Sequence, residues 1–379
     1  MAINDWVQVF QPQFDDEEVK AVSDVLGRKW PGRGIEVDAF EIEFANYLKV
    51  PRENLISTNS CTEAVFQILE LLNLPGYDVI LPTNSFIGVG NAVMHSGMNI
   101  VFCDVSSETG NPTIEDIISA QTSRTRILIV QHYGGYSADM QEIISWARIN
   151  NVIVIEDSAG ALGSQLHRRH CGTFGDFGVW SLDAMKMVVA GDGGMIYCRD
   201  PLMTSELKQR MYLGLVQTTG LSGAQSKDKW WEFDVSHPGR RSIMNDISAS
   251  IARVQLKKLP QNIAKRRINA TIYRENLASI DVLRMPTQEL IESSNNYFFP
   301  IQFEGGSRDI IANHLYSEQI YTTFRYFPLN KLKLFSDSKQ YPNSDRFANE
   351  TLLIPQHPGL REHDLERICN AIRAGMAVL

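Results

Sequence analysis

The chain has 379 residues and a formal net charge of −8, from 36 basic and 44 acidic residues. This length exceeds one simple core, so we expect a large domain over residues 1–260 and a smaller C-terminal domain over residues 261–379. The acidic balance and scattered basic residues argue against nucleic acid as a partner, and the absence of a long apolar run argues against a membrane span.

The amino-terminal segment has no signal-peptide pattern, which favours a cytoplasmic protein. The five cysteines are an odd number, and none of them stands in a CxxC pair. Scattered cysteines of this kind indicate reduced thiols, and they predict neither a disulfide framework nor a metal site.

Short apolar runs alternate with longer amphipathic segments between residues 57 and 200. Runs expected to be strands are residues 79–81, 100–102, 127–130 and 152–155, while residues 114–120 and 140–150 have helical spacing. Short buried strands separated by helices predict an α/β fold with a largely parallel sheet covered on both faces. In such sheets a ligand lies beyond the carboxyl ends of the strands. Polar residues and one aromatic follow the predicted strands there: Asn84, Ser85, Phe86, Asp104, Gln131, His132, Glu156 and Asp157.

The pattern changes after residue 200. We expect residues 201–240 to be irregular. Asn245 and Asp246 can cap a helix that runs through Leu256 towards Ala270. An extended stretch over residues 297–301, further helices and an amphipathic helix over residues 363–376 predict a smaller α+β domain.

Small polar residues open an apolar helix at Ser60, Cys61 and Thr62. Such a helix start presents free amides and hydroxyls to an anion, as a phosphate group requires. An ordinary Ser/Thr cap, with Glu63 favoured by the helix dipole, explains the same residues without a ligand. Phe86 has two interpretations as well: it stacks on a flat ring, or it fills the core.

Two charged positions in apolar surroundings are candidates for chemistry. Asp157, beside Glu156 at the end of the most apolar strand, could pair with a protonated pyridine nitrogen; a carboxylate that caps a helix or faces solvent is the alternative. Lys186 stands in an apolar run before Gly191 to Gly194. Burial there predicts a lowered pKa, which suits an amine that forms a Schiff base, whereas a lysine that extends out to solvent is the other interpretation.

The order and spacing of these stretches resemble the DegT/DnrJ family of sugar aminotransferases over nearly the whole chain. The segments that carry the resemblance are Trp30 to Glu41, Ser60 to Ala64, Pro82 to Phe86, His132 to Gly135, Ala138 to Met140, Glu156 to Ala159, Gly175 to Gly178 with Ser181 and Lys186, and Met244 to Ile247.

The resemblance implies a fold-type-I transferase that depends on pyridoxal 5'-phosphate (PLP), with a mostly parallel sheet of the seven-stranded type. It implies a homodimer with shared active sites. Lys186 would hold the cofactor and move protons, and Asp157 would pair with the ring nitrogen. The other implied cofactor contacts are Ser60, Cys61, Thr62, Phe86, Ser181 and, reaching into the neighbouring subunit, Arg241. The implied substrate contacts are Trp30, His132, Arg240, Arg325 and Asn330.

In such an enzyme L-glutamate would give its amino group to the cofactor, leaving the pyridoxamine 5'-phosphate form, which aminates a keto or aldehydo sugar. The sequence departs from the family at three places. Gly160 stands where His or Gln usually contacts the ring hydroxyl, Arg241 and Ser242 replace Asn and an aromatic, and Asn330 replaces a frequent His.

The acceptor sugar stays open at this point. A nucleotide-linked keto sugar is the default of the family. The cluster of Arg240, Arg241 and Arg325 also suits a free acidic sugar, such as an 8-oxo-3-deoxy-octulosonate of the Kdo type, in lipopolysaccharide or other amino-sugar biosynthesis.

Other functions are weighed against these motifs. A sugar dehydratase of the same family carries His at the position of Lys186, and a non-catalytic, PLP-binding regulatory protein would lose Lys186 or Asp157. No GxGxxG follows the early strands, which disfavours a nicotinamide enzyme. Asp176 to Gly178 spells a kinase triplet, but no other kinase motif accompanies it.

Overall fold

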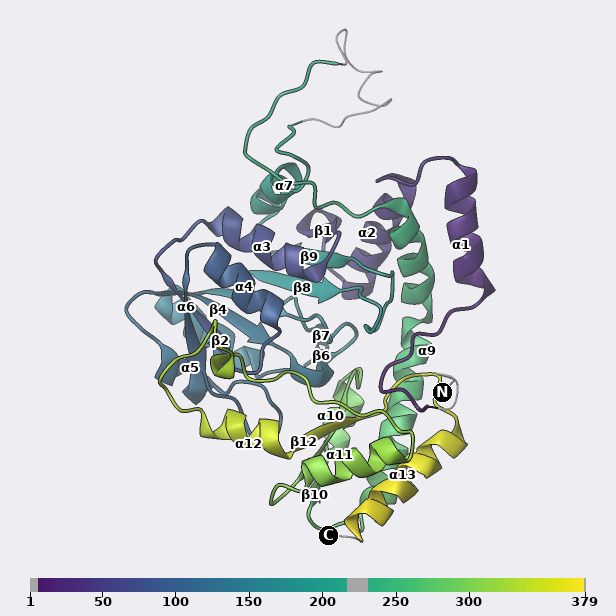
Figure 1. The fold of residues 1–379 in the computed structure, drawn as a ribbon. Helices are drawn as coiled ribbons and strands as arrows, with labels where there is room; N and C mark the ends of the chain where they lie inside the picture. Colours follow the sequence, from purple (N-terminus) through teal and green to yellow (C-terminus); the bar gives the residue numbers. More distant parts are fainter. Residues whose placement is uncertain (1–5, 217–230, 378–379) are drawn as a thin grey trace.

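A seven-stranded sheet forms the centre of the computed structural model, which describes residues 6–216 and 231–377 (Figure 1). The strand order is β1-β9-β8-β5-β4-β2-β3. Strand β9 runs antiparallel to β1 and β8, and the other neighbouring pairs are parallel. The strands are β1 (Leu55–Thr58), β2 (Asp78–Pro82), β3 (Asn99–Cys103), β4 (Thr125–Gln131), β5 (Ile153–Asp157), β8 (Phe177–Ser181) and β9 (Gly194–Cys198). The predicted α/β class and largely parallel sheet are confirmed.

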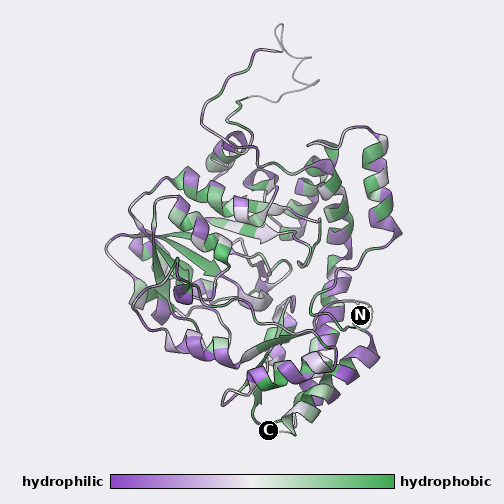
Figure 2. Cartoon of the chain, in the orientation of Figure 1, coloured by the Kyte–Doolittle hydropathy of each residue, from purple (hydrophilic) through white to green (hydrophobic). Residues whose placement is uncertain are grey.

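Helices cover both faces of this sheet, as predicted. One face packs against α3 (Cys61–Leu72), α4 (Ile87–His95) and α7 (Pro201–Arg210). The other face packs against α2 (Ile35–Leu48), α5 (Ile114–Ala120), α6 (Met140–Asn150) and α9 (Asp246–Leu277). Because successive residues of a strand point to opposite faces, the strands of a doubly covered sheet are apolar throughout. Figure 2 shows this arrangement, with hydrophobic strands inside and hydrophilic residues on the outer surfaces of the helices.

The predicted elements agree with the observed ones in most places. Helices α5 and α6 have the expected bounds, and α9 begins where Asn245 caps it through Ser248 N, at 2.9 Å. The expectation that residues 201–240 are irregular is wrong for α7. Asp200 caps that helix by accepting from Leu202 N, and Pro201 suits a first helical turn because it lacks the N–H that would stay unpaired there. Residues 217–230 of the segment lie outside the described residues.

A second, three-stranded antiparallel sheet organises the C-terminal part, in the order β10-β11-β12. Its core joins this sheet to α9, α11 and α13. The elements are β10 (Leu283–Arg284), α10 (Gln288–Ser293), β11 (Phe299–Phe303), α11 (Arg308–Ser317), α12 (Pro342–Glu350), β12 (Thr351–Ile354) and α13 (Glu362–Met376). The expected α+β layout and last helix are present. Residue 260, the predicted domain boundary, lies inside α9, so the division of the chain into two domains stays a prediction.

The remaining elements connect these layers. They are α1 (Asp16–Gly27), the short hairpin β6 (Gln165–Leu166) and β7 (Arg169–His170), and the single turns of 3-10 helix η2 (Arg52–Asn54), η3 (Tyr133–Gly135) and η4 (Leu329–Lys331). Helix α9 runs along one side of the molecule, from α1 and α2 down to α13 (Figure 1).

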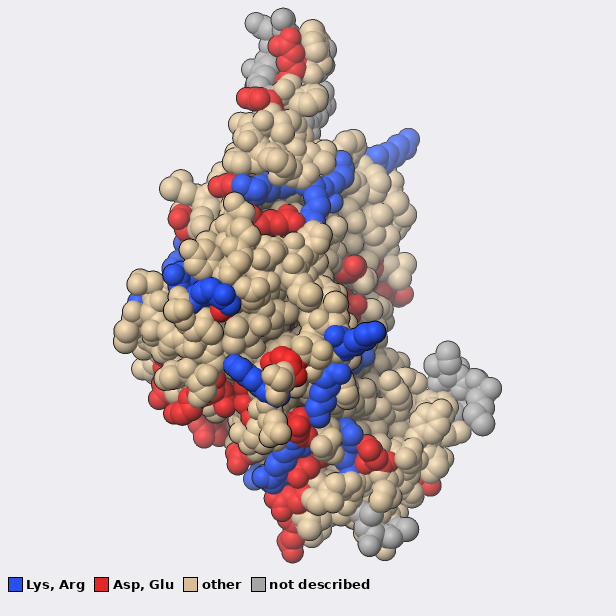
Figure 3. Space-filling view, turned by 60° about the vertical axis from the view of Figure 1, so that its left-hand side comes forward, with Lys and Arg blue, Asp and Glu red and all other residues tan. Residues whose placement is uncertain are grey.

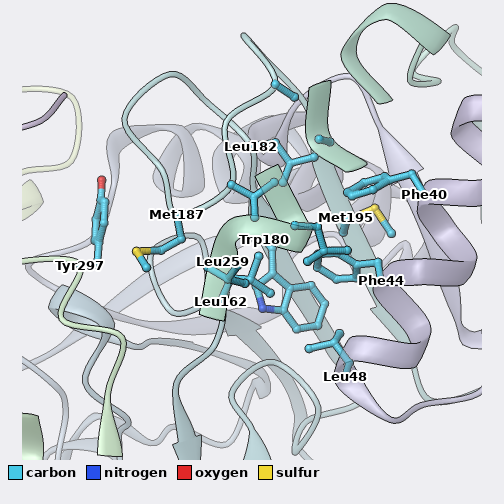
Figure 4. Packing of buried hydrophobic residues seen from close by; sticks show 14 of the residues in the cluster. Phe40, Phe44, Leu48, Leu162, Trp180, Leu182, Met187, Met195, Leu259 and Tyr297 are labelled. Carbon is cyan, nitrogen blue, oxygen red and sulfur yellow. The ribbon is translucent and has the colours of Figure 1, made fainter. Parts of the chain in front are cut away.

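The segment that bears Lys186 packs against the hydrophobic core. Leu182 and Met187, on either side of Lys186 in the sequence, pack with Trp180 and Leu259 in one buried cluster (Figure 4). Trp180 is fully buried, and its ring meets Phe44 at a centroid distance of 5.4 Å. A densely packed core deforms little, so this cluster fixes the position of the Lys186 backbone relative to the sheet.

On the face seen in Figure 3, acidic and basic side chains are interspersed, without one continuous basic area. Among the described residues, none of the helices has the length and apolar character to cross a membrane. No group of three or more metal-binding side chains occurs in the described part of the chain.

His357 gives the first testable prediction, a pH dependence of stability. Burial and the Arg266 guanidinium lower the pKa of His357 to about 4, whereas an unfolded histidine titrates near pH 6.5. The unfolded chain therefore takes up the proton first, so the stabilisation is complete above about pH 6.5 and is lost as the pH falls towards 4. Between pH 7 and pH 5 we expect this group to account for a loss of about 2 kcal/mol in the free energy of unfolding.

Urea unfolding of wild type and His357→Gln at both pH values measures this difference. The variant should lose less stability on acidification than wild type. His363→Gln is the matched control, because the His363 side chain is 78% exposed, and it should keep the wild-type pH dependence. Equal acid sensitivity of wild type and His357→Gln would contradict the prediction.

Candidate active site

A cavity of about 330 Å³ opens at the carboxyl ends of the central strands. The large sheet and its helices supply one wall, and residues near β11 and before η4 supply the other. Its lining includes nine predicted site residues: Ser60, Cys61, Thr62, Phe86, His132, Asp157, Ser181, Lys186 and Arg325. Ser60 and Arg325, which are more than 260 positions apart in the sequence, therefore line the same cavity. The cavity lies at the carboxyl ends of the strands, where the sequence pattern predicted a ligand.

The N-terminus of α3 forms one end of the cavity. Ser60 is the helix cap, and its hydroxyl accepts from Glu63 N at 3.1 Å, so the simple capping interpretation holds. The first amides of a helix have no acceptor within it, and Cys61 and Thr62, the first two residues of α3, line the cavity. These amides and the positive end of the helix dipole suit an anion such as phosphate. Burial raises the pKa of the Cys61 thiol, so it stays neutral.

The glycines after Lys186 allow this helix start to approach the sheet. A Cβ on Gly194, at the start of β9, would lie 2.7 Å from Cys61 N. Gly191 and Gly193 have φ angles of +81° and +147°, which L side chains rarely adopt. The tight turn seen in the sequence therefore brings the Lys186 segment and the α3 N-terminus together.

Glu156 and Asp157 divide into two roles because adjacent strand residues point to opposite faces. Glu156 is fully buried and accepts from His132 Nε2 at 2.9 Å, Gly172 N at 2.7 Å and Gly175 N at 2.5 Å. It holds loops in place. Asp157 faces the cavity, where one carboxylate oxygen accepts from Ala159 N at 3.1 Å.

Burial raises the pKa of Asp157, against the opposing effects of the Ala159 amide and the nearby positive charge of Lys186. A carboxylate in such a place gains from a cationic partner. His132 lies behind it, with both ring nitrogens engaged, since Nδ1 accepts from Ala138 N at 3.2 Å.

Lys186 points into the cavity from the loop between β8 and β9. Its Nζ donates to the Tyr297 hydroxyl at 3.3 Å. Burial alone lowers the pKa of Lys186, but the oxygens of Tyr297 and Tyr326 and the Asp157 carboxylate outweigh it, and the net direction is upward. The predicted lowered pKa is therefore wrong. The sequence revealed the burial and not the oxygens that the fold brings to the ammonium.

Phe86 lies at the mouth of the cavity and is 40% exposed, which excludes the interpretation as a core residue. Its ring meets that of Tyr326 edge to face at 5.6 Å. An exposed aromatic ring at this place can stack on a flat ligand. Ser181, at the end of β8, lines the cavity and its Oγ accepts from Asp183 N at 3.3 Å.

Sequence reasoning missed two tyrosines in the lining, Tyr297 and Tyr326. Neither belongs to a local motif, since each reaches the cavity from the C-terminal part of the chain. The only available signal was the aromatic, extended character of their segments. Arg325, beside Tyr326, lies over the Phe10 ring at 5.2 Å and donates to Met185 Sδ at 3.4 Å.

Four predicted residues do not line this cavity. Trp30 is 63% exposed and donates to Arg33 O. Arg240 pairs with Glu63 at 3.1 Å and Glu70 at 3.0 Å. Arg241 lies 5.5 Å from the Tyr212 ring centroid, and Asn330 lies in η4.

Ion pairs hold Arg240 on the outer side of α3. A role for these four residues in a shared site between two subunits stays a prediction.

Asp104, expected at the ligand edge, instead accepts from Asn343 N and Ser344 N and so secures the start of α12.

The family model for the DegT/DnrJ/EryC1/StrS aminotransferases matches residues 12–373. The chain belongs to this family. It is a PLP-dependent sugar aminotransferase, which confirms the resemblance, the enzyme class and the cofactor predicted from the sequence.

Three relatives illustrate the match. The chain is 38% identical to the dTDP-4-dehydro-2,3,6-trideoxy-D-glucose 4-aminotransferase of Saccharopolyspora spinosa, covering 96% of this chain and 95% of that protein. The aminotransferase TlmJ from Streptoalloteichus hindustanus superposes with a TM-score of 0.93 at 40% identity, over 98% and 99% of the two chains. The PLP form of the putative sugar aminotransferase Spr1654 from Streptococcus pneumoniae has the same fold, with a TM-score of 0.89 at 23% identity over 99% of this chain and all of that one.

The residues of the cavity fit PLP. The N-terminus of a helix suits the phosphate, and an aromatic ring at the mouth suits stacking. The buried Asp157 carboxylate suits a protonated ring nitrogen, and Lys186 supplies a primary amine within the same cavity.

Proposed function

We propose that this aminotransferase transfers the amino group of L-glutamate to a keto sugar linked to a nucleoside diphosphate. One observation carries the chemistry: Lys186 and Asp157 line the same cavity, which the N-terminus of α3 closes at one end. The acceptor class is supported by the Saccharopolyspora spinosa relative, whose name specifies a dTDP-linked keto sugar.

Several of the cavity residues have a proposed part in this reaction. When bound, PLP would supply an electron-withdrawing ring and, outside the ring, the carbon that carries the amino group between the two substrates. Asp157 holds the proton on the ring nitrogen. Lys186 Nζ would take up the proton that leaves the donor carbon and give it back later in the reaction, as general base and then general acid. The amides of Cys61 and Thr62 bind the phosphate.

Arg325 is proposed to bind the α-carboxylate of the donor, since a guanidinium matches a carboxylate with two parallel hydrogen bonds. Arg325→Ala should raise the apparent dissociation constant of L-glutamate about ten- to a hundredfold, the value of one charge-assisted contact. Single-turnover absorbance changes at varied glutamate measure it. Arg346→Ala, which removes an arginine paired with Glu350, is the control and should leave the constant unchanged. An unchanged constant in Arg325→Ala would assign the carboxylate to another residue.

The identity of the acceptor is tested by mass spectrometry of the product. The purified holoenzyme is incubated with L-glutamate and either nucleotide-linked keto sugars or an 8-oxo-3-deoxy-octulosonate. We expect a gain of an amino group only on a nucleotide-linked sugar. Amination of the octulosonate alone would support the free acidic sugar instead. Of the three arginines predicted to bind the carboxylate of such a sugar, Arg325 lines the cavity of this chain.

The assembly and setting belong to the same proposal. We propose a cytoplasmic homodimer with shared active sites, in which Arg241 reaches the cofactor phosphate of the neighbouring subunit. Lipopolysaccharide or another amino-sugar polymer is the proposed destination of the product. Sedimentation equilibrium would test the dimer, and a purely monomeric active enzyme would contradict it.

A further inference from the structure

Gly160 and Tyr297, far apart in the sequence, fit against each other in the wall of the cavity. A Cβ on Gly160 would lie 2.6 Å from Cδ1 and 3.0 Å from Cε1 of Tyr297. Carbon atoms that are not bonded attract each other best at about 3.5–4.0 Å, so any side chain at residue 160 would displace the ring. Glycine is required here for space, because its φ is not among the positive values.

Asn295 fixes this fit from both sides. It is fully buried, and its Nδ2 donates to Gly160 O at 2.8 Å and to Leu162 O at 2.9 Å. Its Oδ1 accepts from Tyr297 N at 2.9 Å. The Tyr297 ring also stacks on Phe298 at a centroid distance of 4.3 Å. One side chain therefore ties the loop after β5 to the backbone of Tyr297, and the ring has little freedom to move.

The hydroxyl of this fixed ring faces the reacting amine. Tyr297 OH lies 3.3 Å from Lys186 Nζ, and in Figure 4 Tyr297 stands apart from the packed side chains around Trp180. In PLP the ring hydroxyl is on the carbon next to the one that bears the aldehyde, with which a lysine amine combines. A phenol 3.3 Å from Nζ is therefore within reach of the ring oxygen of a cofactor bound to that amine.

We infer that Tyr297 donates a hydrogen bond to the ring hydroxyl oxygen of PLP, in the space that Gly160 leaves open. The structure thereby assigns the contact that the sequence left without a residue when Gly160 replaced the expected His or Gln. The inference rests on the PLP dependence of the enzyme and is independent of the acceptor sugar. It makes Tyr297 a cofactor-positioning residue contributed by the C-terminal part of the chain.

The test measures equilibrium binding to the apoenzyme of PLP and of a PLP analogue that lacks only the ring hydroxyl. Tyr297→Phe keeps the ring and removes the donor, so it should weaken PLP binding about tenfold. The same substitution should leave the affinity for the analogue unchanged, since the analogue has no ring oxygen to bind. Tyr136→Phe is the matched control: Tyr136 is buried and its hydroxyl donates to Phe298 O at 3.1 Å, outside the cavity, so both affinities should stay at wild-type values.

Two results would overturn the inference. One is an unchanged PLP affinity in Tyr297→Phe. The other is an equal loss for PLP and for the analogue, which would assign Tyr297 to its contact with Lys186 or to packing, without a contact to the ring oxygen. Gly160→Ala gives a second, independent readout. The added methyl must move the Tyr297 ring, so PLP affinity should fall at least tenfold in a protein that circular dichroism shows to be folded. Wild-type affinity would show that the two residues are not matched.

Discussion

Replacing Lys186 by alanine is expected to reduce turnover by at least about a thousandfold. The variant loses the only primary amine that lines the described cavity, and with it both the covalent hold on the cofactor and the proton carrier. The helix N-terminus, Phe86 and Asp157 remain, so PLP should still bind, without a covalent bond to the protein.

Borohydride reduction followed by peptide mass spectrometry provides the direct measurement. In wild type the reduced cofactor should be found on Lys186, and in Lys186→Ala on no residue. Lys331→Ala serves as the control, because Lys331 is a surface lysine paired with Asp345 at 2.6 Å, and it should be labelled and active like wild type. Labelling of a different lysine in wild type would remove Lys186 from the centre of the mechanism.

Asp157→Asn is expected to lower turnover by roughly two to four orders of magnitude, comparable to the removal of a key electrostatic stabiliser. The amide has nearly the same shape but cannot keep the ring nitrogen protonated. Its hydrogen bond with Ala159 N is retained if the amide oxygen takes the place of Oδ1. Folding should therefore be close to normal while the reaction is slow.

The neighbouring carboxylate provides a contrast for this experiment. Glu156→Gln places an amide where three donors converge, so it should lower the thermal midpoint and affect turnover far less than Asp157→Asn. Kinetics of both half-reactions and thermal unfolding of both variants separate the two roles. A near-normal rate in Asp157→Asn with an intact fold would move the pairing with the ring nitrogen to another residue.

The parts of the site predicted from the sequence share one physical property: each is local. Apolar strands that end in polar residues can be recognised from a few consecutive positions, which is why Asp157, Phe86 and the start of α3 were located before the fold was known. The apolar run and the glycine turn marked Lys186 in the same way, but its role came from the family resemblance, because the segment alone also allowed a lysine that extends out to solvent. The sheet edge then brings these local signals together.

The parts that sequence reasoning missed depend on long-range packing. Tyr297 and Tyr326 reach the cavity from segments that carry no motif, and the raised pKa of Lys186 follows from their oxygens. Helix α7 was missed because its cap, Asp200, precedes a sequence with little apolar periodicity. Arg240 was expected at the substrate, but its pairing with Glu63 and Glu70 could not be foreseen from spacing alone.

Helix α9 has a mechanical consequence for any motion between the two parts of the molecule. It is one continuous helix of 32 residues that packs on α1 and α2 near one end and on α10 and α13 near the other. Bending a helix requires breaking its backbone hydrogen bonds, except where one is already missing. Pro260, inside α9, has no N–H and leaves the carbonyl of Leu256 without its helical donor. If the C-terminal part moves towards the sheet during turnover, α9 can bend at Pro260 at the smallest energetic cost.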